Sequence, residues 1–217
     1  MKIKLSILTI SLIFCVIIII STEDLFTKKV RIGKQVWMEH NLNVRKFRNG
    51  DIIKRARSKA EWEEAMKNQE PAWCYFNNKK RYDHTFTGKL YNWYAVADSR
   101  GLAPAGWRVA NSEDWSQLVK FLGSDVAAEQ IRAREGWESF DECTNESGFT
   151  AIPGGYRDHS GHFSSVKELG YWWTSKRSIY SYSGIDADAI YMDYESDVIN
   201  IRLDSGSGLA VRCIKED

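Results

Sequence analysis

The chain has 217 residues, of which 30 are Lys or Arg and 29 are Asp or Glu, so its formal net charge is +1. This near balance leaves no excess of cations to neutralise phosphates, which argues against nucleic acid as a partner. Four cysteines and four histidines without C-x-x-C spacing exclude a disulfide-framework miniprotein and give no zinc pattern. We therefore expect one sizeable domain that needs no metal and no cofactor.

The N-terminal segment has the layout of an export signal. Lys2 and Lys4 begin it, the stretch Leu5–Ile20 carries no charge, and acidic residues start only at Glu23. The apolar stretch is long for a signal peptide and short of the ~20 residues that span a bilayer. Residues 1–21 are therefore predicted to be a signal peptide or an N-terminal membrane anchor, followed by a polar connector at 22–29. Both alternatives place the rest of the chain outside the cytoplasm, secreted or, if the segment is uncleaved, anchored to the membrane.

Local signals predict a hairpin and three helices in the first part of the chain. The hairpin joins residues 30–32 to 35–38 through the Gly33-Lys34 turn. Apolar residues at helical spacing follow each predicted helix start. The first helix is expected after a capping box of Ser58 and Glu61. The second is expected over Ser112–Leu122, with Asn111 or Ser112 as its cap. The third is expected over Asp125–Arg134, with Val126, Ala127 and Ile131 facing inward.

From Gly148 onward the apolar residues alternate with a period of two, which is typical of strands. Helices early and a meander of strands late predict an α+β fold and not a parallel βαβ sheet. The strands are predicted at Phe149–Ile152, His162–Ser164, Tyr171–Ser175, Ala187–Tyr194, Val198–Leu203 and Leu209–Ile214.

Nine sequence blocks follow one another in a characteristic order. They are Ile32–Met38 with Asn41–Asn43, Trp73–Tyr75, Gly88–Val96, Gly101–Trp107, Glu113–Trp115, Thr144–Phe149, Pro153–Arg157, Gly170–Ser175 and Val211–Cys213. This order closely resembles the Fibrobacter succinogenes major paralogous domain, and we expect a single such domain at 30–217. The resemblance implies an exported or surface protein with a C-type-lectin-like fold, similar also to formylglycine-generating enzymes. In that fold early helices pack on a mostly antiparallel sheet of short strands. It implies no established activity.

The chain departs from the family pattern at three positions. The usual Cys, His and Pro are replaced by Ala103, Arg108 and Ala110. The lost cysteine matters, because Cys213 then lacks its usual disulfide partner. Cys143 or Cys74 could replace that partner, and the sequence leaves both pairings open.

Four residues form the candidate binding site. Tyr156 and Arg157 follow Pro153 and two glycines, so they are predicted on a loop that offers a stacking face and a planar fork of donors. Trp172 and Trp173 are neighbours in a strand and must point to opposite faces. Together they suit a shallow surface for a sugar or a peptide. The alternative is a structural lock, in which Arg157 pairs with a buried carboxylate and both indoles are packed.

No motif indicates catalysis. The sequence lacks a Gly-rich phosphate loop, H-E-x-x-H and G-x-S-x-G. A formylglycine-generating type of enzyme needs two neighbouring cysteines late in the chain, whereas Cys213 stands alone. His159 and His162 are expected on an exposed turn and not at a metal. A cluster of acidic residues could offer oxygen ligands to calcium: Asp186, Asp188, Asp193, Glu195 and Asp197. However, Asp193, Glu195 and Asp197 occur at every second position, which is typical of the solvent-facing side of a strand.

These observations lead to an expected function. The chain is predicted to be an exported, non-catalytic binding or adhesion domain that recognises a glycan, another cell-surface polymer or a surface protein. The first alternative is a structural or assembly module of the cell envelope without a small ligand. A more remote alternative is a metal-dependent modifying enzyme of the formylglycine-generating type, acting through Cys213.

Overall fold

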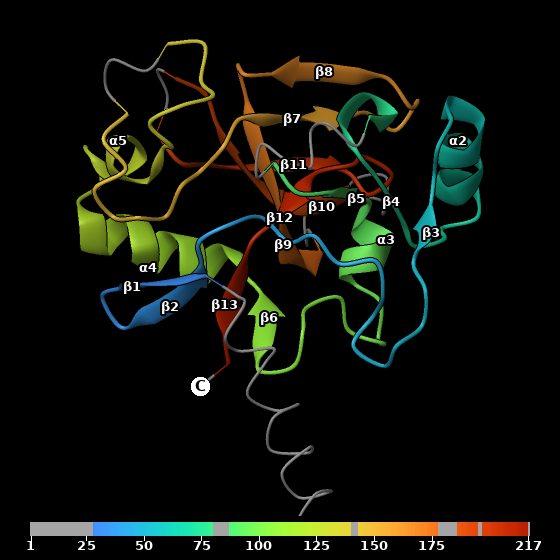
Figure 1. Cartoon of the computed structure of the whole chain (residues 1–217), viewed down its shortest axis with the longest axis horizontal. Coiled ribbons are helices and arrows are strands. Elements are labelled where there is room, and N and C mark those ends of the chain that lie inside the picture. The colour runs from blue at the N-terminus through green and yellow to red at the C-terminus, as the bar shows by residue number, and fades with distance from the viewer. Residues whose placement is uncertain (1–27, 80–86, 140–142, 178–185, 195–196, 217) are drawn as a thin grey trace, which may run out of the picture.

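One antiparallel sheet brings the start and the end of the folded chain together. β1 (Lys29–Ile32) and β2 (Gln35–Met38) form the predicted hairpin, and β13 (Cys213–Lys215) and β6 (Trp107–Val109) complete the order β1-β2-β13-β6. Gly33 takes a positive φ of 58° in the hairpin turn, as its position predicts. The computed structural model describes residues 28–79, 87–139, 143–177, 186–194 and 197–216 (Figure 1).

A second four-stranded sheet forms the centre of the molecule (Figure 1). Its order is β11-β10-β9-β12, built from Ile199–Asp204 (β11), Asp186–Met192 (β10), Gly170–Arg177 (β9) and Ala210–Val211 (β12). The first three strands are antiparallel, and β12 runs parallel to β9. The predicted strand at Leu209–Ile214 is thus divided at Arg212 between β12 of this sheet and β13 of the first.

Two smaller sheets lie beside the central one. β3 (Lys54–Arg55), β4 (Ala72–Cys74) and β5 (Leu90–Tyr91) form one, and β7 (Gly154–Arg157) and β8 (Phe163–Val166) form the other. Most strand pairs are antiparallel, which confirms the α+β class with a mostly antiparallel, short-stranded sheet. The described elements contain more strand than helix.

Helices pack against these sheets, and α4 contacts the inner strands β9 and β10 of the central one. The two longer ones begin where the sequence predicts, because side-chain caps satisfy their first amides. Ser58 accepts from the amide of Glu61, although the Glu61 carboxylate bonds the Arg57 amide instead of completing the box. The helical elements are α2 (Lys59–Lys67), the 3-10 turn η1 (Phe76–Asn78), α3 (Trp93–Val96), α4 (Ser112–Leu122) and α5 (Ala127–Ile131).

The third helix is shorter than predicted. It spans Ala127–Ile131 and not Asp125–Arg134, and the predicted inward residue Val126 is 41% exposed. Arg132 already has extended backbone and pairs with Ala151 through an isolated bridge. The chain therefore leaves the helix to reach a tertiary partner that helical periodicity cannot reveal. The strand predicted over Phe149–Ile152 is wrong for the same reason, since only this bridge forms there.

The Pro-Gly-Gly segment also differs from its prediction. Gly154–Arg157 forms β7, paired with β8, and not a loop. Gly155 has a φ of 61°, and a Cβ built there would lie 2.4 Å from the Ser164 carbonyl oxygen. The glycine is therefore required because the β8 backbone approaches it closely, as glycines in strands often allow.

Buried aromatic side chains form the core on both faces of the central sheet. Trp172 contacts the cluster under α4 and α5, whereas Trp173 belongs to the cluster that contains Trp73 and Trp93. Their opposite directions confirm the strand prediction, and each indole is 0% exposed. No helix among the described residues is long and apolar enough to cross a bilayer, and the predicted segment 1–21 lies outside them.

Candidate binding site

Three of the four predicted site residues are interior. Trp172, Trp173 and Arg157 are each 0% exposed, whereas Tyr156 is half-buried. The Trp172 indole donates to Asn41 at 2.8 Å, and the Trp173 indole donates to the Tyr91 carbonyl at 2.8 Å. A ligand on the surface therefore does not reach these two indoles in this structure, and the shallow surface they were predicted to form is replaced by a packed core.

Arg157 has a structural role, but it bonds carbonyl groups where a buried carboxylate was predicted. Its guanidinium donates to the carbonyls of Gly161 at 3.1 Å and Ser58 at 2.9 Å, and no carboxylate pairs with it among the described residues. It also lies 4.7 Å from the ring of Trp62 and 4.6 Å from that of Phe163. Arg157 thus joins β7 and the β7–β8 turn to the start of α2.

The cysteines do not form the predicted pairings. Cys74, Cys143 and Cys213 lie in three different core clusters, and no disulfide joins them in the described structure. Burial raises the pKa of the Cys74 thiol to about 11, despite the nearby guanidinium of Arg157. Burial likewise raises the pKa of the Cys213 thiol to about 12. Both thiols are therefore protonated, and poor nucleophiles, at neutral pH.

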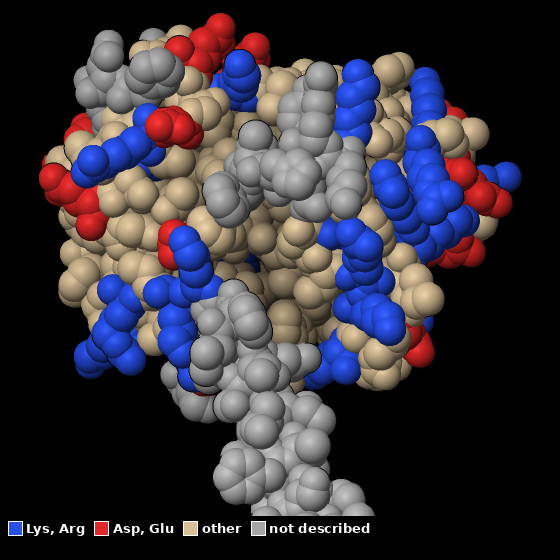
Figure 2. Space-filling model, viewed as in Figure 1, with Lys and Arg blue, Asp and Glu red and all other residues tan. Residues whose placement is uncertain are grey.

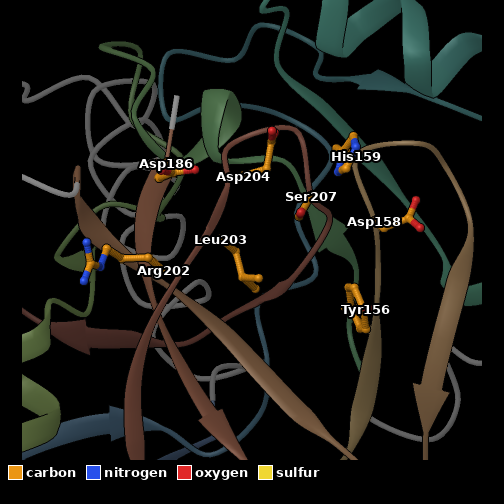
Figure 3. Close-up of a pocket in the computed structure, with 8 residues that line it drawn as sticks. All are labelled: Tyr156, Asp158, His159, Asp186, Arg202, Leu203, Asp204 and Ser207. Carbon is orange, nitrogen blue, oxygen red and sulfur yellow. The ribbon is translucent and has the colours of Figure 1, made fainter. Parts of the chain in front are cut away.

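A hollow of about 440 Å³ opens beside Tyr156. We call it the Tyr156 hollow. Figure 3 shows Tyr156, Leu203 and Ser207 around its middle, with five charged or titratable side chains spread around them. These rim residues are Asp158, His159, Asp186, Arg202 and Asp204. The hollow therefore joins the end of β7 to the hairpin of β10 and β11 and to the turn after β11.

The turn after β7 fixes one side of the hollow. Asp158 accepts from the His162 amide at 2.9 Å and from the Ser160 hydroxyl at 2.8 Å. Burial opposes ionisation of Asp158, but these hydrogen bonds and the nearby His162 outweigh it and lower its pKa. His162 is exposed on this turn, as predicted, and His159 stands on the rim of the hollow, which the sequence did not indicate.

The turn after β11 fixes the other side. Asp204 accepts from the Gly206 amide at 2.7 Å, and its carbonyl accepts from the Ser207 amide at 2.8 Å. The Trp62 indole donates to the Gly206 carbonyl at 2.9 Å, which ties this turn to α2. Two rim carboxylates thus sit on hydrogen-bonded turns and need little reorganisation to receive donors from a ligand.

Tyr156 also begins a row of three half-buried tyrosines across β7, β9 and β10. Its ring centroid lies 4.9 Å from that of Tyr171, which lies 5.3 Å from that of Tyr191. Burial raises the pKa of Tyr171 to about 12. A hydrogen bond to Asp193 raises the pKa of Tyr191, whose hydroxyl donates to that carboxylate at 2.5 Å. The row holds Tyr156 against the sheet.

The Tyr156 hollow offers oxygen acceptors and an apolar floor. Three carboxylates and one guanidinium suit hydroxyl or amino groups, and the Tyr156 ring and Leu203 suit the apolar side of a sugar ring. Among the described residues, which include Asp186, Asp188, Asp193 and Asp197 of the predicted acidic cluster, no group of three or more possible metal ligands occurs. Part of that predicted cluster, Glu195, lies outside the described residues.

Comparisons with known proteins identify the family. No curated protein and no solved structure matches the chain. The family model described as the Fibrobacter succinogenes major domain matches residues 30–215, which is nearly the whole region predicted as one domain. This match confirms the predicted family: the chain belongs to the Fibrobacter succinogenes major domain family.

Proposed function

We propose that this chain is an exported, non-catalytic binding domain that holds a neutral or amino-sugar unit of a glycan in the Tyr156 hollow. The observation that carries the proposal is the combination of a half-buried tyrosine ring with three rim carboxylates in one hollow of about 440 Å³. A hollow of this size is in the range of small-ligand sites. The carboxylates favour hydroxyl and ammonium donors and repel anionic sugars.

Two further features support this role. The α+β arrangement, with helices packed against mostly antiparallel short strands, is compatible with a C-type-lectin-like fold. The apolar segment Leu5–Ile20 after Lys2 and Lys4 is typical of export and supports a location at or beyond the cell envelope. In such a location a binding domain meets glycans of the cell surface or its surroundings.

Catalysis through Cys213 has less physical support. Its thiol is fully buried, and burial raises its pKa to about 12, so the thiolate that such chemistry requires is scarce at neutral pH. Cys74 is equally buried and lies in a different cluster. The two thiols therefore do not supply a neighbouring pair.

The test is a glycan array probed with the full-length chain in non-ionic detergent, followed by calorimetry with the best oligosaccharide. We expect neutral or amino-sugar hits. Asp186→Ala should weaken them ~10-fold, because it removes a charged hydrogen-bond acceptor. Tyr156→Leu should also weaken them, since it removes the stacking face while keeping an apolar side chain.

Asp125→Ala is the matched control, because Asp125 is exposed between α4 and α5 and does not line the hollow. Its affinity should equal that of the unmodified chain. The proposal is wrong if no neutral or amino sugar binds, or if Asp186→Ala and Asp125→Ala behave alike. Self-association without any glycan hit, detected by crosslinking, would instead support the assembly-module alternative.

A further inference from the structure

A second hollow of about 660 Å³ lies between the loop that links β2 to β3 and the loop before β6. We call it the basic groove, because the described residues of its wall include Arg45, Lys46, Arg48 and Lys89 and no acidic residue. Figure 1 draws the two loops in cyan and green, side by side at the lower right. Figure 2 shows Lys and Arg side chains gathered over the cyan loop.

Arg48 builds the groove by tying its two walls together. Its Nε donates to the Ala103 carbonyl at 3.0 Å, and its backbone amide donates to the Gly101 carbonyl at 2.7 Å. Its guanidinium also contacts Glu216 at 3.1 Å. Arg48 is thus engaged in holding the loops, and the shape of the groove is fixed before any ligand arrives.

Lys89 places a positive charge at the inner end of the groove. The residue is 1% exposed, and its ammonium donates to the Asn43 carbonyl at 2.7 Å and to the Asn43 side chain. The ammonium also lies 4.9 Å from the ring centroid of Trp73 and 5.3 Å from that of Tyr75. A charge held away from water in this way acts more strongly on an anion than an exposed lysine does.

Arg45 and Lys46 are the exposed donors of the groove. Both belong to the short turn in which the Ile53 amide bonds the Arg45 carbonyl and Lys46 bridges Ile52. Arg45 contacts the Tyr75 hydroxyl at 3.3 Å, which orients its guanidinium. The two side chains therefore offer hydrogen-bond donors at the mouth, while Lys89 adds charge inside.

Part of the positive charge around the groove is unpaired. Nearby Arg100 is paired with Asp98 at 2.8 Å and Asp51 at 3.2 Å, and Arg48 is paired with Glu216. Within the part of the chain that the structure describes, Arg45 and Lys46 form no ion pair, and both line the groove. Their charges contrast with the carboxylates of the Tyr156 hollow.

We propose that the basic groove binds the carboxylate-bearing sugar units of an acidic polysaccharide. The carboxylate would meet Arg45 and Lys46, in the geometry that guanidinium groups provide for planar anions, and the buried charge of Lys89 would attract it from behind them. The half-buried side chains of Val44 and Pro104 form an apolar wall for the face of the sugar ring. Phosphate polymers and a flat bilayer surface offer no sugar-ring face to this wall.

The proposal is tested by calorimetry of the full-length chain with oligogalacturonate and with its uncharged methyl ester. We expect oligogalacturonate to bind and the ester to bind at least ~10-fold more weakly, since the ester loses the charge-assisted hydrogen bonds. Arg45→Ala and Lys46→Ala should each weaken oligogalacturonate binding ~5–10-fold. Added salt should weaken binding further, because exposed charges are screened.

Lys120→Ala, at an exposed position of α4, is the matched control and should leave the affinity unchanged. Asp186→Ala should also leave it unchanged, which separates this groove from the Tyr156 hollow. Equal binding of acid and ester, no effect of Arg45→Ala and Lys46→Ala, or loss in Asp186→Ala would each overturn the proposal. Tighter binding of inorganic polyphosphate or phosphatidylglycerol vesicles than of oligogalacturonate would overturn it as well.

Discussion

Arg212→Lys should destabilise the fold, because lysine offers fewer hydrogen-bond donors. Arg212 is 1% exposed, and the five N–H groups of its guanidinium make six hydrogen-bond contacts, so one N–H group is shared between two carbonyls. Five of the contacts are accepted by the side chain of Asn41 and by the carbonyls of Met38, Phe149 and Thr150. The sixth goes to the Glu39 carbonyl at 2.7 Å. Arg212 thereby ties β2 and the segment before β7 to the junction of β12 and β13.

The expected loss follows from counting donors. The guanidinium has five N–H donors and a lysine ammonium has three, so at least two donors disappear. At about 1 kcal/mol each, the free energy of unfolding should fall by about 2 kcal/mol, more if buried carbonyls stay unpaired. Burial lowers the pKa of Arg212 to about 9, so the guanidinium is still charged at pH 7. The same burial lowers the pKa of a lysine at this site, so any loss of its charge adds to the loss of hydrogen bonds.

Urea unfolding at pH 7, analysed by linear extrapolation, measures this loss. In a thermal scan the same change corresponds to a shift in Tm of roughly 4–8 °C for a domain of this size. Arg31→Lys is the control, because Arg31 is exposed on β1 and should change stability by less than ~0.5 kcal/mol. A loss below ~1 kcal/mol in Arg212→Lys would refute the role of Arg212 as the link between these segments.

Three further predictions concern the thiols, alkaline stability and the start of α4. Cys74 and Cys213 should resist thiol reagents in the native protein at pH 8 and react once it is unfolded; rapid native labelling, located by peptide mass spectrometry, would contradict their burial. Burial raises the pKa of Cys74, Cys213 and Tyr171 to about 11, 12 and 12 in the folded protein. As the pH rises, the unfolded chain therefore loses these three protons at a lower pH than the folded protein does. The urea midpoint should therefore fall as pH rises above the ordinary thiol value of 9.0, and a flat profile would contradict this. Asp114→Ala should cost about 2 kcal/mol and Arg108→Ala about 1 kcal/mol, because Asp114 both pairs with Arg108 and closes the α4 capping box. Equal losses in thermal unfolding would show that the cap contributes nothing.

Local sequence signals predicted the elements whose causes are local. The hairpin and helix α4 depend on a glycine turn and on the Asn111 cap. The second hairpin strand and α4 have the predicted bounds, and the first strand begins one residue earlier, at Lys29. β7 could not be predicted in this way. Its two glycines indicate a turn, whereas Gly155 is needed because the β8 backbone, which is distant in sequence, packs against it.

The binding site was less predictable than the fold. Period-two spacing correctly placed Trp172 and Trp173 on opposite faces of a strand, but their burial depends on what covers each face of the sheet. The Tyr156 hollow joins three segments, at 156–159, 186 and 202–207, that no sequence pattern connects. Tyr156 is the one predicted site residue that lines it, and the others come from the turn after β7, the start of β10, the end of β11 and the turn that follows β11.

A crystal structure of the chain with the best neutral or amino-sugar oligosaccharide from the array tests the central claim most directly. We predict the sugar ring against Tyr156, with its hydroxyl or amino groups within hydrogen-bond distance of Asp186 or Asp204. An empty Tyr156 hollow at a saturating concentration of this ligand, or a ligand bound elsewhere on the domain, would contradict the account.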